Sequence, residues 1–472
     1  MMPGTTFKQL IQDATDRAIE YGVLHKDQSA GETIVRLVPI TLWPSVFPRI
    51  HYDFLLQVQM DYNLLVNKLS GSVLLMDSLR CIMKHDDFIR RLFEVYSKID
   101  WMKQPISICL QRCDYFLHIG HSEEDGCRRV TPKLVEMNIF GPASAGSILN
   151  VGKVHKVLQA NYQDSEFKEH YKGEILNPDP ISVISRAMAI AWKEYGKPKA
   201  AILLVVNENE WNVFDLGNFE LKMALEYQIK VIRHTFGELY NMATIKEDSG
   251  LLVNDTEIAV VYYRSGYDPS HFPTEKQWSA YLMLEQSKAI KCPPVSHHLC
   301  TFKRVQQVIS NPTVLESLLD DPAMIERIRS TFVGQYSLEL GPEGDKVVEM
   351  ALKNPENFVL KTQTEAKREC YMDEVLREKL LQIQKLESRI AYTLMDRINY
   401  PTQEFVVVGS DSKHQVLQTC PEVGMFGVLV RNGEKVLMNS PAGYSAKCLP
   451  TKLDEVSLVN GALSSLILTS ES

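Results

Sequence analysis

One run of residues limits the fold of this chain more than any other: Ala201 to Val206, Ala-Ile-Leu-Leu-Val-Val, which is apolar without interruption. A strand that is apolar at every position is typically buried on both faces, as in a parallel sheet that helices cover. A helical pattern follows through Phe219, and a second apolar run spans Ile258 to Tyr263. This alternation predicts α/β units, and we expect residues 198–296 to form a parallel-sheet domain of their own.

Polar side chains follow both of these apolar runs. Asn207 comes after the first run, and Arg264-Ser265-Gly266-Tyr267 comes after the second. Functional groups in such sheets gather beyond the carboxyl ends of the strands. A guanidinium at that edge suits bidentate binding of a carboxylate, whereas a surface arginine in an ordinary glycine turn is the alternative interpretation.

Two further predicted strands end in charged or amide side chains. The strand that begins at Ile106 ends in Arg112 and Asp114. The segment Leu134 to Ile139 alternates, so Glu136 and Asn138 share one face of a strand, two residues apart. Two oxygen ligands on one face suit a hard cation such as Mg²⁺, although the same pair also occurs on solvated strands.

A third strand carries a lysine toward a polar loop. Phe358 to Leu360 form a short apolar run, and Lys361 and Glu365 follow it. A lysine and a carboxylate placed there could hold phosphate and metal. A strand that ends in a solvated charged turn is the alternative.

Composition excludes several classes of protein. With 472 residues, 45% hydrophobic and 23% charged, the chain fits a soluble globular protein of two or three domains. A net charge of -8 argues against broad binding to nucleic acid or anionic membrane. Nine scattered cysteines without a CxxC pair indicate neither a disulfide framework nor a zinc site. Charged residues near the start and the lack of long apolar stretches predict a cytoplasmic protein, or a secreted one whose signal peptide has been removed.

Several of these segments, in order along the chain, resemble eukaryotic glutathione synthetase, an ATP-grasp ligase. Asn357 to Asp373 with Met395-Asp396-Arg397-Ile398 resembles the nucleotide-clamping lid of that family, and Glu136-Met-Asn138 resembles its magnesium strand. Arg264 to Tyr267 resembles its substrate loop, and Phe302 to Gln307 resembles the helix that carries its phosphate lysine.

The resemblance implies an α/β fold with an α+β main body, ATP-grasp-like, with a parallel-sheet substrate domain and a lid. The main body would comprise residues 1–197, 297–334 and 416–472, and the lid residues 335–415. The family joins γ-glutamylcysteine to glycine through an acyl phosphate, with ATP and Mg²⁺, and is a homodimer. No nucleic acid or membrane partner is implied.

Roles carry over residue by residue. Magnesium would be held by Glu136, Asn138 and Glu365. Lys303 and Lys361 would neutralise phosphates and, with Glu365, form the catalytic set; Met395, Asp396 and Glu422 would complete the nucleotide pocket. Substrate would be bound by Arg112, Asn207, Arg264, Ser265, Gly266, Tyr267 and Lys447.

The chain departs from the family pattern at three places. Gly141 and Ala143 stand where the family has serines, and Ala366-Lys367-Arg368 stands where it has glycines. Lys447 takes the position of a family arginine. Two alternatives to glutathione synthesis therefore stay open: a relative that acts on a different thiol or acceptor, and a non-catalytic binding protein on the same fold.

Overall fold

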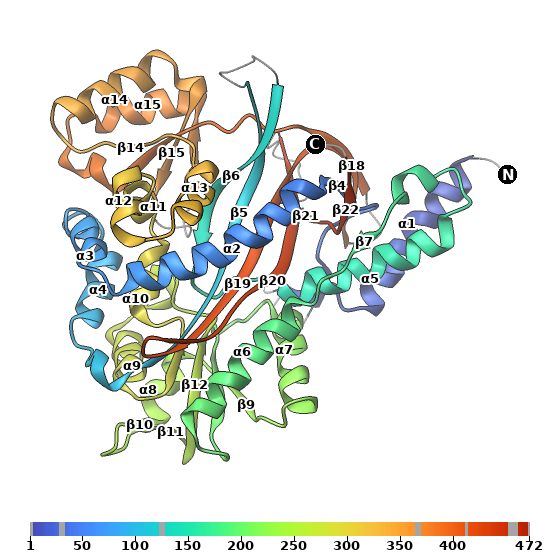
Figure 1. Ribbon diagram of the computed structural model, residues 1–472. Helices are drawn as coiled ribbons and strands as arrows, with labels where there is room; N and C mark the ends of the chain where they lie inside the picture. Colours follow the sequence, from blue (N-terminus) through green and yellow to red (C-terminus); the bar gives the residue numbers. More distant parts are fainter. Residues whose placement is uncertain are drawn as a thin grey trace.

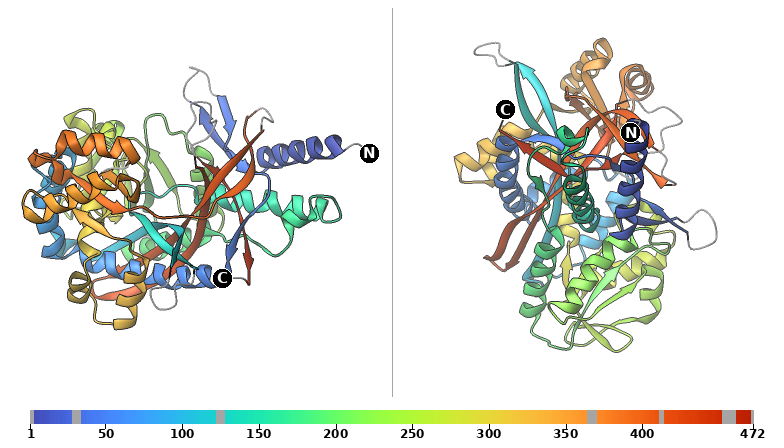
Figure 2. Two further views of the ribbon diagram at one scale, coloured as in Figure 1. Left: turned by 90° about the horizontal axis from the view of Figure 1, so that it is seen from above. Right: turned by 90° about the vertical axis from the view of Figure 1, so that its right-hand side faces the viewer.

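The computed structural model describes residues 3–27, 34–121, 128–363, 370–410, 414–451 and 461–470. For residues 3–5 and 121 it describes the backbone only. Within these residues the strands form sheets of seven, six, four, three and two strands. None of the described helices is long and apolar enough to span a bilayer. Figure 1 and Figure 2 show α14 (Pro342–Lys353) and α15 (Asp373–Ile383) at one end of the molecule and the N-terminal helix α1 (Pro3–Glu20) at the other.

The largest sheet has the strand order β18-β3-β21-β20-β19-β5-β6. Its bounds are β18 Gln403–Val408, β3 Ile40–Thr41, β21 Ala462–Leu463, β20 Lys435–Pro450, β19 His414–Asn432, β5 Ile106–His121 and β6 Arg128–Asn138. Alternate residues of the central strands enter two different cores: Cys109 and Leu429 lie in one, Ile108 and Val428 in the other. Helices therefore cover both faces of this sheet, as its alternating burial requires.

The first of these cores lies under α2 (Arg49–Ser70), which runs along β19 and β20 (Figure 1). Around it pack α3 Val73–Arg80, α4 Asp87–Tyr96, α10 Val295–His298, α11 Lys303–Ile309, α12 Pro312–Leu318 and α13 Pro322–Thr331. Asp86 accepts the backbone N–H of Ile89 at 3.0 Å and so caps α4. The other face is covered by α6 (Pro180–Tyr195).

Further elements, among them β22 near the C-terminus, flank the large sheet on the side away from α14 and α15 (Figure 1). They are α1 Pro3–Glu20, α5 Ala145–Tyr162, the two-stranded sheet of β1 Leu24–Asp27 and β2 Ile34–Leu37, and the three-stranded sheet of β4 Ser45–Pro48, β22 Leu466–Thr469 and β7 Ile175–Leu176. Gly22 follows α1 with φ +70°, a conformation that glycine adopts readily at a helix end.

The six-stranded sheet contains the apolar run that starts at Ala201. Its strands β8 Ala201–Val205, β9 Val231–His234, β12 Thr256–Tyr263 and β13 Ile290–Cys292 are parallel, and its helices are α7 Val213–Leu225, α8 Phe236–Met242 and α9 Glu275–Gln286. All five residues of β8 are fully buried, which confirms burial on both faces. The sheet is mixed, because β10 Ala243–Ile245 and β11 Leu251–Val253 form an antiparallel hairpin that joins β12.

The four-stranded sheet has the order β14-β17-β15-β16 and lies beneath α14 (Pro342–Lys353) and α15 (Asp373–Ile383). Its bounds are β14 Gln335–Ser337, β17 Tyr392–Asp396, β15 Phe358–Thr362 and β16 Cys370–Met372. The helix α15 stops at Ile383, and the guanidinium of Arg389 donates to the carbonyl of Gln384 just beyond it.

These sheets confirm the predicted α/β fold class. The division into domains stays a prediction, and one strand bears on it. β18 lies inside the range 335–415 expected for the lid, yet it pairs with β19 and β3 of the seven-stranded sheet.

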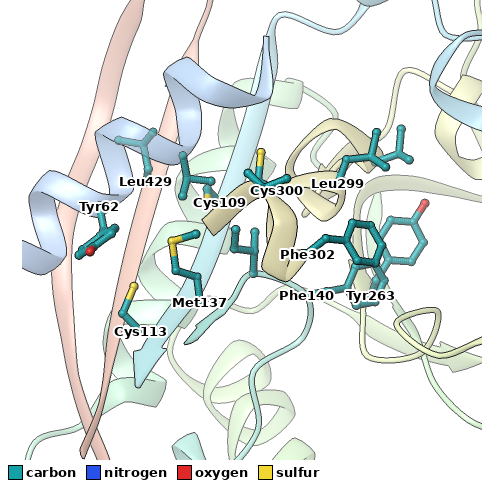
Figure 3. Close-up of a cluster of buried hydrophobic side chains, with 14 of the residues drawn as sticks. Tyr62, Cys109, Cys113, Met137, Phe140, Tyr263, Leu299, Cys300, Phe302 and Leu429 are labelled. Carbon is teal, nitrogen blue, oxygen red and sulfur yellow. The ribbon is translucent and has the colours of Figure 1, made fainter. Parts of the chain in front are cut away.

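A buried histidine, His298, packs beside the first core. His298 is fully buried, its ring lies 4.2 Å from that of Phe140, and neither ring nitrogen has a hydrogen-bond partner among the described residues. Figure 3 shows Phe140, Phe302 and Leu299 in this cluster. Burial lowers the pKa of His298 to about 3, so the unfolded chain binds a proton below pH ~6.5 that the folded chain does not.

We therefore expect stability to fall as pH falls from ~6.5, and His298→Phe to remove part of that fall. Between pH 6.5 and 4.5 the histidine alone costs the wild type about 2 kcal/mol of unfolding free energy. Urea unfolding at both pH values measures the change for each protein. Equal losses in wild type and variant would contradict the assignment.

Candidate functional site

A cavity of about 1110 Å³ lies where the seven-stranded sheet, the parallel strands and the four-stranded sheet approach one another. Twelve of the residues predicted from the sequence line it: Arg112, Glu136, Asn138, Asn207, Arg264, Tyr267, Lys303, Lys361, Met395, Asp396, Glu422 and Lys447. Ser265 and Gly266, which lie between Arg264 and Tyr267 after β12, are described but do not line it. Glu365 and the loop Ala366 to Arg368 lie outside the described residues.

Two lysines from different elements reach the same strand. Lys303, the first residue of α11, places its Nζ 2.8 Å from Oε2 of Glu136. Lys361 on β15 donates from Nζ to the carbonyl of Val135 at 3.3 Å. Lys361 thus lies against the same segment of β6 that carries Glu136.

A β-bulge explains why the Val135 carbonyl is available. On β5 and β6, Asp114 pairs with Glu136 but the next residue, Tyr115, pairs with Leu134, so Val135 has no opposite residue. Bulges leave a residue outside the ladder and are common beside active sites. Here the bulge turns a backbone oxygen toward Lys361.

Burial and neighbouring charges shift the pKa values of Glu136 and Lys361. Burial opposes ionisation of Glu136, but Lys303 and Lys361 outweigh it and keep the pKa of this carboxyl well below its usual value. Burial, and then the neighbouring charge of Lys303, lower the pKa of Lys361. Glu136 therefore lies between two ammonium groups, and this local excess of positive charge favours a further anion beside them.

The predicted substrate arginine at the end of β12 is fixed by backbone and carboxylate. Arg264 donates from Nη1 to the carbonyl of Pro142 at 2.7 Å, and its Nη2 lies 3.6 Å from Oδ2 of Asp215. Asp215 in turn accepts the backbone N–H groups of Gly146 (2.6 Å) and Ser147 (3.0 Å) at the start of α5. The guanidinium thus has a set position beside the cavity.

The loop at Gly141 differs physically from one that carries serine. Gly141 has φ +54°, and a Cβ built there would lie 2.9 Å from the carbonyl oxygen of Tyr263. A serine hydroxyl cannot be added without moving one of the two chain segments. The carbonyl of Ala143 accepts a hydrogen bond from Nη1 of Arg112 at 3.0 Å. The loop therefore contributes a backbone oxygen to the site.

The far wall of the cavity holds two carboxyl groups with raised pKa values. Asp396 accepts the backbone N–H of Gly334 at 3.0 Å and the Tyr336 hydroxyl at 3.1 Å, and burial raises its pKa. Glu422 lies opposite Lys447 on neighbouring strands; burial and then the charge of Asp114 raise its pKa to about 7. Through its two hydrogen bonds, Asp396 at the end of β17 is joined to Gly334, just before β14, and to Tyr336 on β14.

Asp114 is the functional candidate that sequence reasoning left without a role. It is 1% exposed, and its carboxylate touches both Arg112 and Asn138. The signal was present in the sequence, since Arg112 and Asp114 are two residues apart and share a face of β5. The side chains of β6 that Asp114 contacts depend on the register of the two strands, which cannot be read from the sequence.

Comparison with known proteins decides the family. The profile described as eukaryotic glutathione synthase, ATP binding domain, matches residues 4–468. The chain belongs to this family. The human glutathione synthetase is 35% identical over 443 residues, covering 93% of this chain and 91% of that protein. The chloroplastic glutathione synthetase of Solanum lycopersicum is 32% identical over 428 residues, covering 90% and 76%.

The fold of the glutathione synthase family is found again among solved structures. A glutathione synthetase like-effector from Globodera pallida, in its apo form, superimposes with a TM-score of 0.79 and covers 99% of this chain and 98% of its own. Its sequence identity is 22%, so this likeness concerns the fold alone.

Proposed function

We propose that this protein is an ATP-dependent ligase that joins γ-glutamylcysteine to glycine, as glutathione synthetases do. The observation that carries the proposal is the meeting of Lys303, Lys361 and Glu136 in one cavity with Arg112 and Arg264. Family membership over residues 4–468 supports the same reaction type.

The lysines serve the phosphates in this proposal. Lys303 and Lys361 reach the cavity from a helix and from the lid strand, so they can neutralise the oxygens of a triphosphate from two sides. In the resting protein Glu136 holds Lys303 in place through their 2.8 Å contact. The nucleotide would lie between β15 and β17 of the lid and the strands β5, β6 and β19, against Met395, Asp396 and Glu422.

The oxygen donors fit Mg²⁺. Glu136 and Asn138 lie on one face of β6, and hard cations prefer carboxylate and amide oxygens. No group of three His, Cys, Asp or Glu side chains that could hold a metal occurs in the described part of the chain, and the predicted third ligand Glu365 lies outside that part. When bound, Mg²⁺ would offset the charge that develops on the transferred phosphoryl group.

The proposed reaction has two steps. A carboxylate oxygen of γ-glutamylcysteine attacks the γ-phosphorus of ATP, and ADP leaves. The glycine amine then attacks the acyl carbon, phosphate departs with that carboxylate oxygen, and the nitrogen loses a proton. We assign Lys361 and Lys303, with Glu365, to the first step, and Arg112, Asn207, Arg264, Tyr267 and Lys447 to holding the substrates. The homodimer of the family belongs to the same proposal.

The test is turnover by the purified protein with ATP, Mg²⁺, γ-glutamylcysteine and glycine. We expect ~1 to 10³ turnovers per second, with one phosphate released for each glutathione formed. Omitting either substrate should stop both products. Phosphate release that needs neither substrate would contradict ligase activity.

A second candidate, a ligase for a different thiol or acceptor, is favoured by the loop at Gly141. Glycine has no side chain that could donate to a substrate, and a Cβ at this position would lie only 2.9 Å from the Tyr263 carbonyl oxygen. Substrate-dependent phosphate release with another γ-glutamyl thiol or another amine, exceeding that with γ-glutamylcysteine and glycine, would support this candidate.

A further inference from the structure

The carboxylate of Asp114 sits at the junction of the predicted substrate and metal groups. Its Oδ1 accepts Nε of Arg112 at 2.6 Å, and its Oδ2 accepts Nη2 of the same guanidinium at 2.8 Å. The same Oδ2 accepts Nδ2 of Asn138 at 2.7 Å. One buried carboxylate thus orients a guanidinium on its own strand and an amide on the neighbouring strand.

The Asn138 amide has only one orientation that satisfies its neighbours. Its Nδ2 donates to Asp114 and also to Oε1 of Glu136, at 3.1 Å. Both neighbours are carboxylates, which only accept, so the amide nitrogen must face them. The carbonyl oxygen Oδ1 is therefore turned away from Asp114, and it is the atom of Asn138 that can serve as a ligand to a hard cation.

Arg112 is held just as firmly. Two of its nitrogens bind Asp114 in a fork, and Nη1 donates to the Ala143 carbonyl at 3.0 Å. Gly424 on β19 lies opposite Asp114, and a Cβ there would come within 2.3 Å of Oδ1 of Asp114 and 2.8 Å of Nε of Arg112. Because Gly424 has no side chain, the Arg112–Asp114 ion pair fits into this space.

We propose that Asp114 is a positioning residue that couples the substrate-binding Arg112 to the metal ligand Asn138. The inference rests on the proposed function, because it gives Asp114 a task within the same site. Groups that hold metal ligands in place commonly contribute 10- to 100-fold to metal affinity. Asp114 would act on the metal through Asn138 and on the acyl substrate through Arg112.

The first test is Asp114→Asn, which keeps the shape but replaces one acceptor oxygen with an NH₂ donor. That donor would face Arg112 or Asn138, so one of them must turn away. We expect the Mg²⁺ concentration that gives the half-maximal thermal shift, at a fixed concentration of a non-hydrolysable ATP analogue, to rise about 10- to 100-fold. The KM for γ-glutamylcysteine should also rise.

Asp61→Asn is the matched control. Asp61 is buried and holds Arg327 in the same bidentate way, at 2.6 and 3.0 Å, between α2 and α13, and it does not line the cavity. It should lower thermal stability without changing the Mg²⁺ requirement. If Asp114→Asn lowers stability and leaves the Mg²⁺ requirement as in the wild type, Asp114 is structural and the inference is wrong.

A double-mutant cycle keeps the test sharp if Asp114→Asn is unstable. In an Asn138→Ala background, Asp114→Asn should change the Mg²⁺ requirement less than about two-fold, because the group it positions is gone. A full additive effect would overturn the coupling. A wild-type protein without any Mg²⁺-nucleotide shift would instead overturn the proposed function, and this inference with it.

Discussion

Lys361→Met is expected to lower kcat/KM of the ligase reaction about 100- to 1,000-fold. Removing one preorganised donor from a site where charge develops typically has an effect of this size. Lys361 reaches the Val135 carbonyl from β15, which places its charge beside Glu136 and Lys303. Lys303→Met should have an effect of the same order, since Lys303 on α11 contacts Glu136 directly.

Lys346→Met is the control for this measurement. Lys346 lies on α14, which packs on the same four-stranded sheet as Lys361, and its side chain is 71% exposed. Its replacement should leave the rate of phosphate release unchanged. A loss of less than ten-fold in Lys361→Met, with a normal thermal melt, would remove Lys361 from the catalytic set.

Glu285→Leu is expected to lower the free energy of unfolding by about 3 to 5 kcal/mol. Glu285 is fully buried, and its two oxygens accept the Tyr263 hydroxyl at 2.8 Å and the backbone N–H of Val295 at 3.0 Å. Burial lowers the pKa of the neighbouring Lys291 to about 8, and the charge of Glu285 works against that shift. The substitution leaves two donors and a buried ammonium without their carboxylate.

Urea unfolding measures this loss. Glu226→Leu makes the same substitution at a side chain that is 54% exposed, where we expect a change within about 0.5 kcal/mol. Similar unfolding free energies for the two variants would show that the Glu285 network contributes no more than a surface ion pair.

Local patterns in the sequence were sufficient for the strands that carry the site. The uninterrupted apolar run at Ala201 corresponds to the fully buried β8, and the alternation through Glu136 and Asn138 corresponds to β6. Both patterns follow from short-range rules on side-chain direction and burial. The positions of Asn207 and Arg264 at one edge follow from the parallel arrangement of β8 and β12.

Features that depend on register or long-range pairing could not be predicted in this way. The bulge at Val135 depends on the register of β5 against β6, and the place of β18 in the large sheet depends on its pairing with the distant strand β3. Asp114 shows the same limit. Its residue type and its strand could be predicted from the sequence, but its contact with Asn138 forms only when β5 and β6 pair.

The central claim is that the carboxylate of γ-glutamylcysteine becomes an acyl phosphate in the cavity between Lys303, Lys361 and Arg112. The most direct measurement uses γ-glutamylcysteine labelled with ¹⁸O in both oxygens of its cysteinyl carboxylate, with ATP, Mg²⁺ and glycine. Mass spectrometry of the released phosphate should find one ¹⁸O atom for each phosphate formed. Phosphate that carries no ¹⁸O while ATP is consumed would contradict the acyl phosphate route and the assignment of this site.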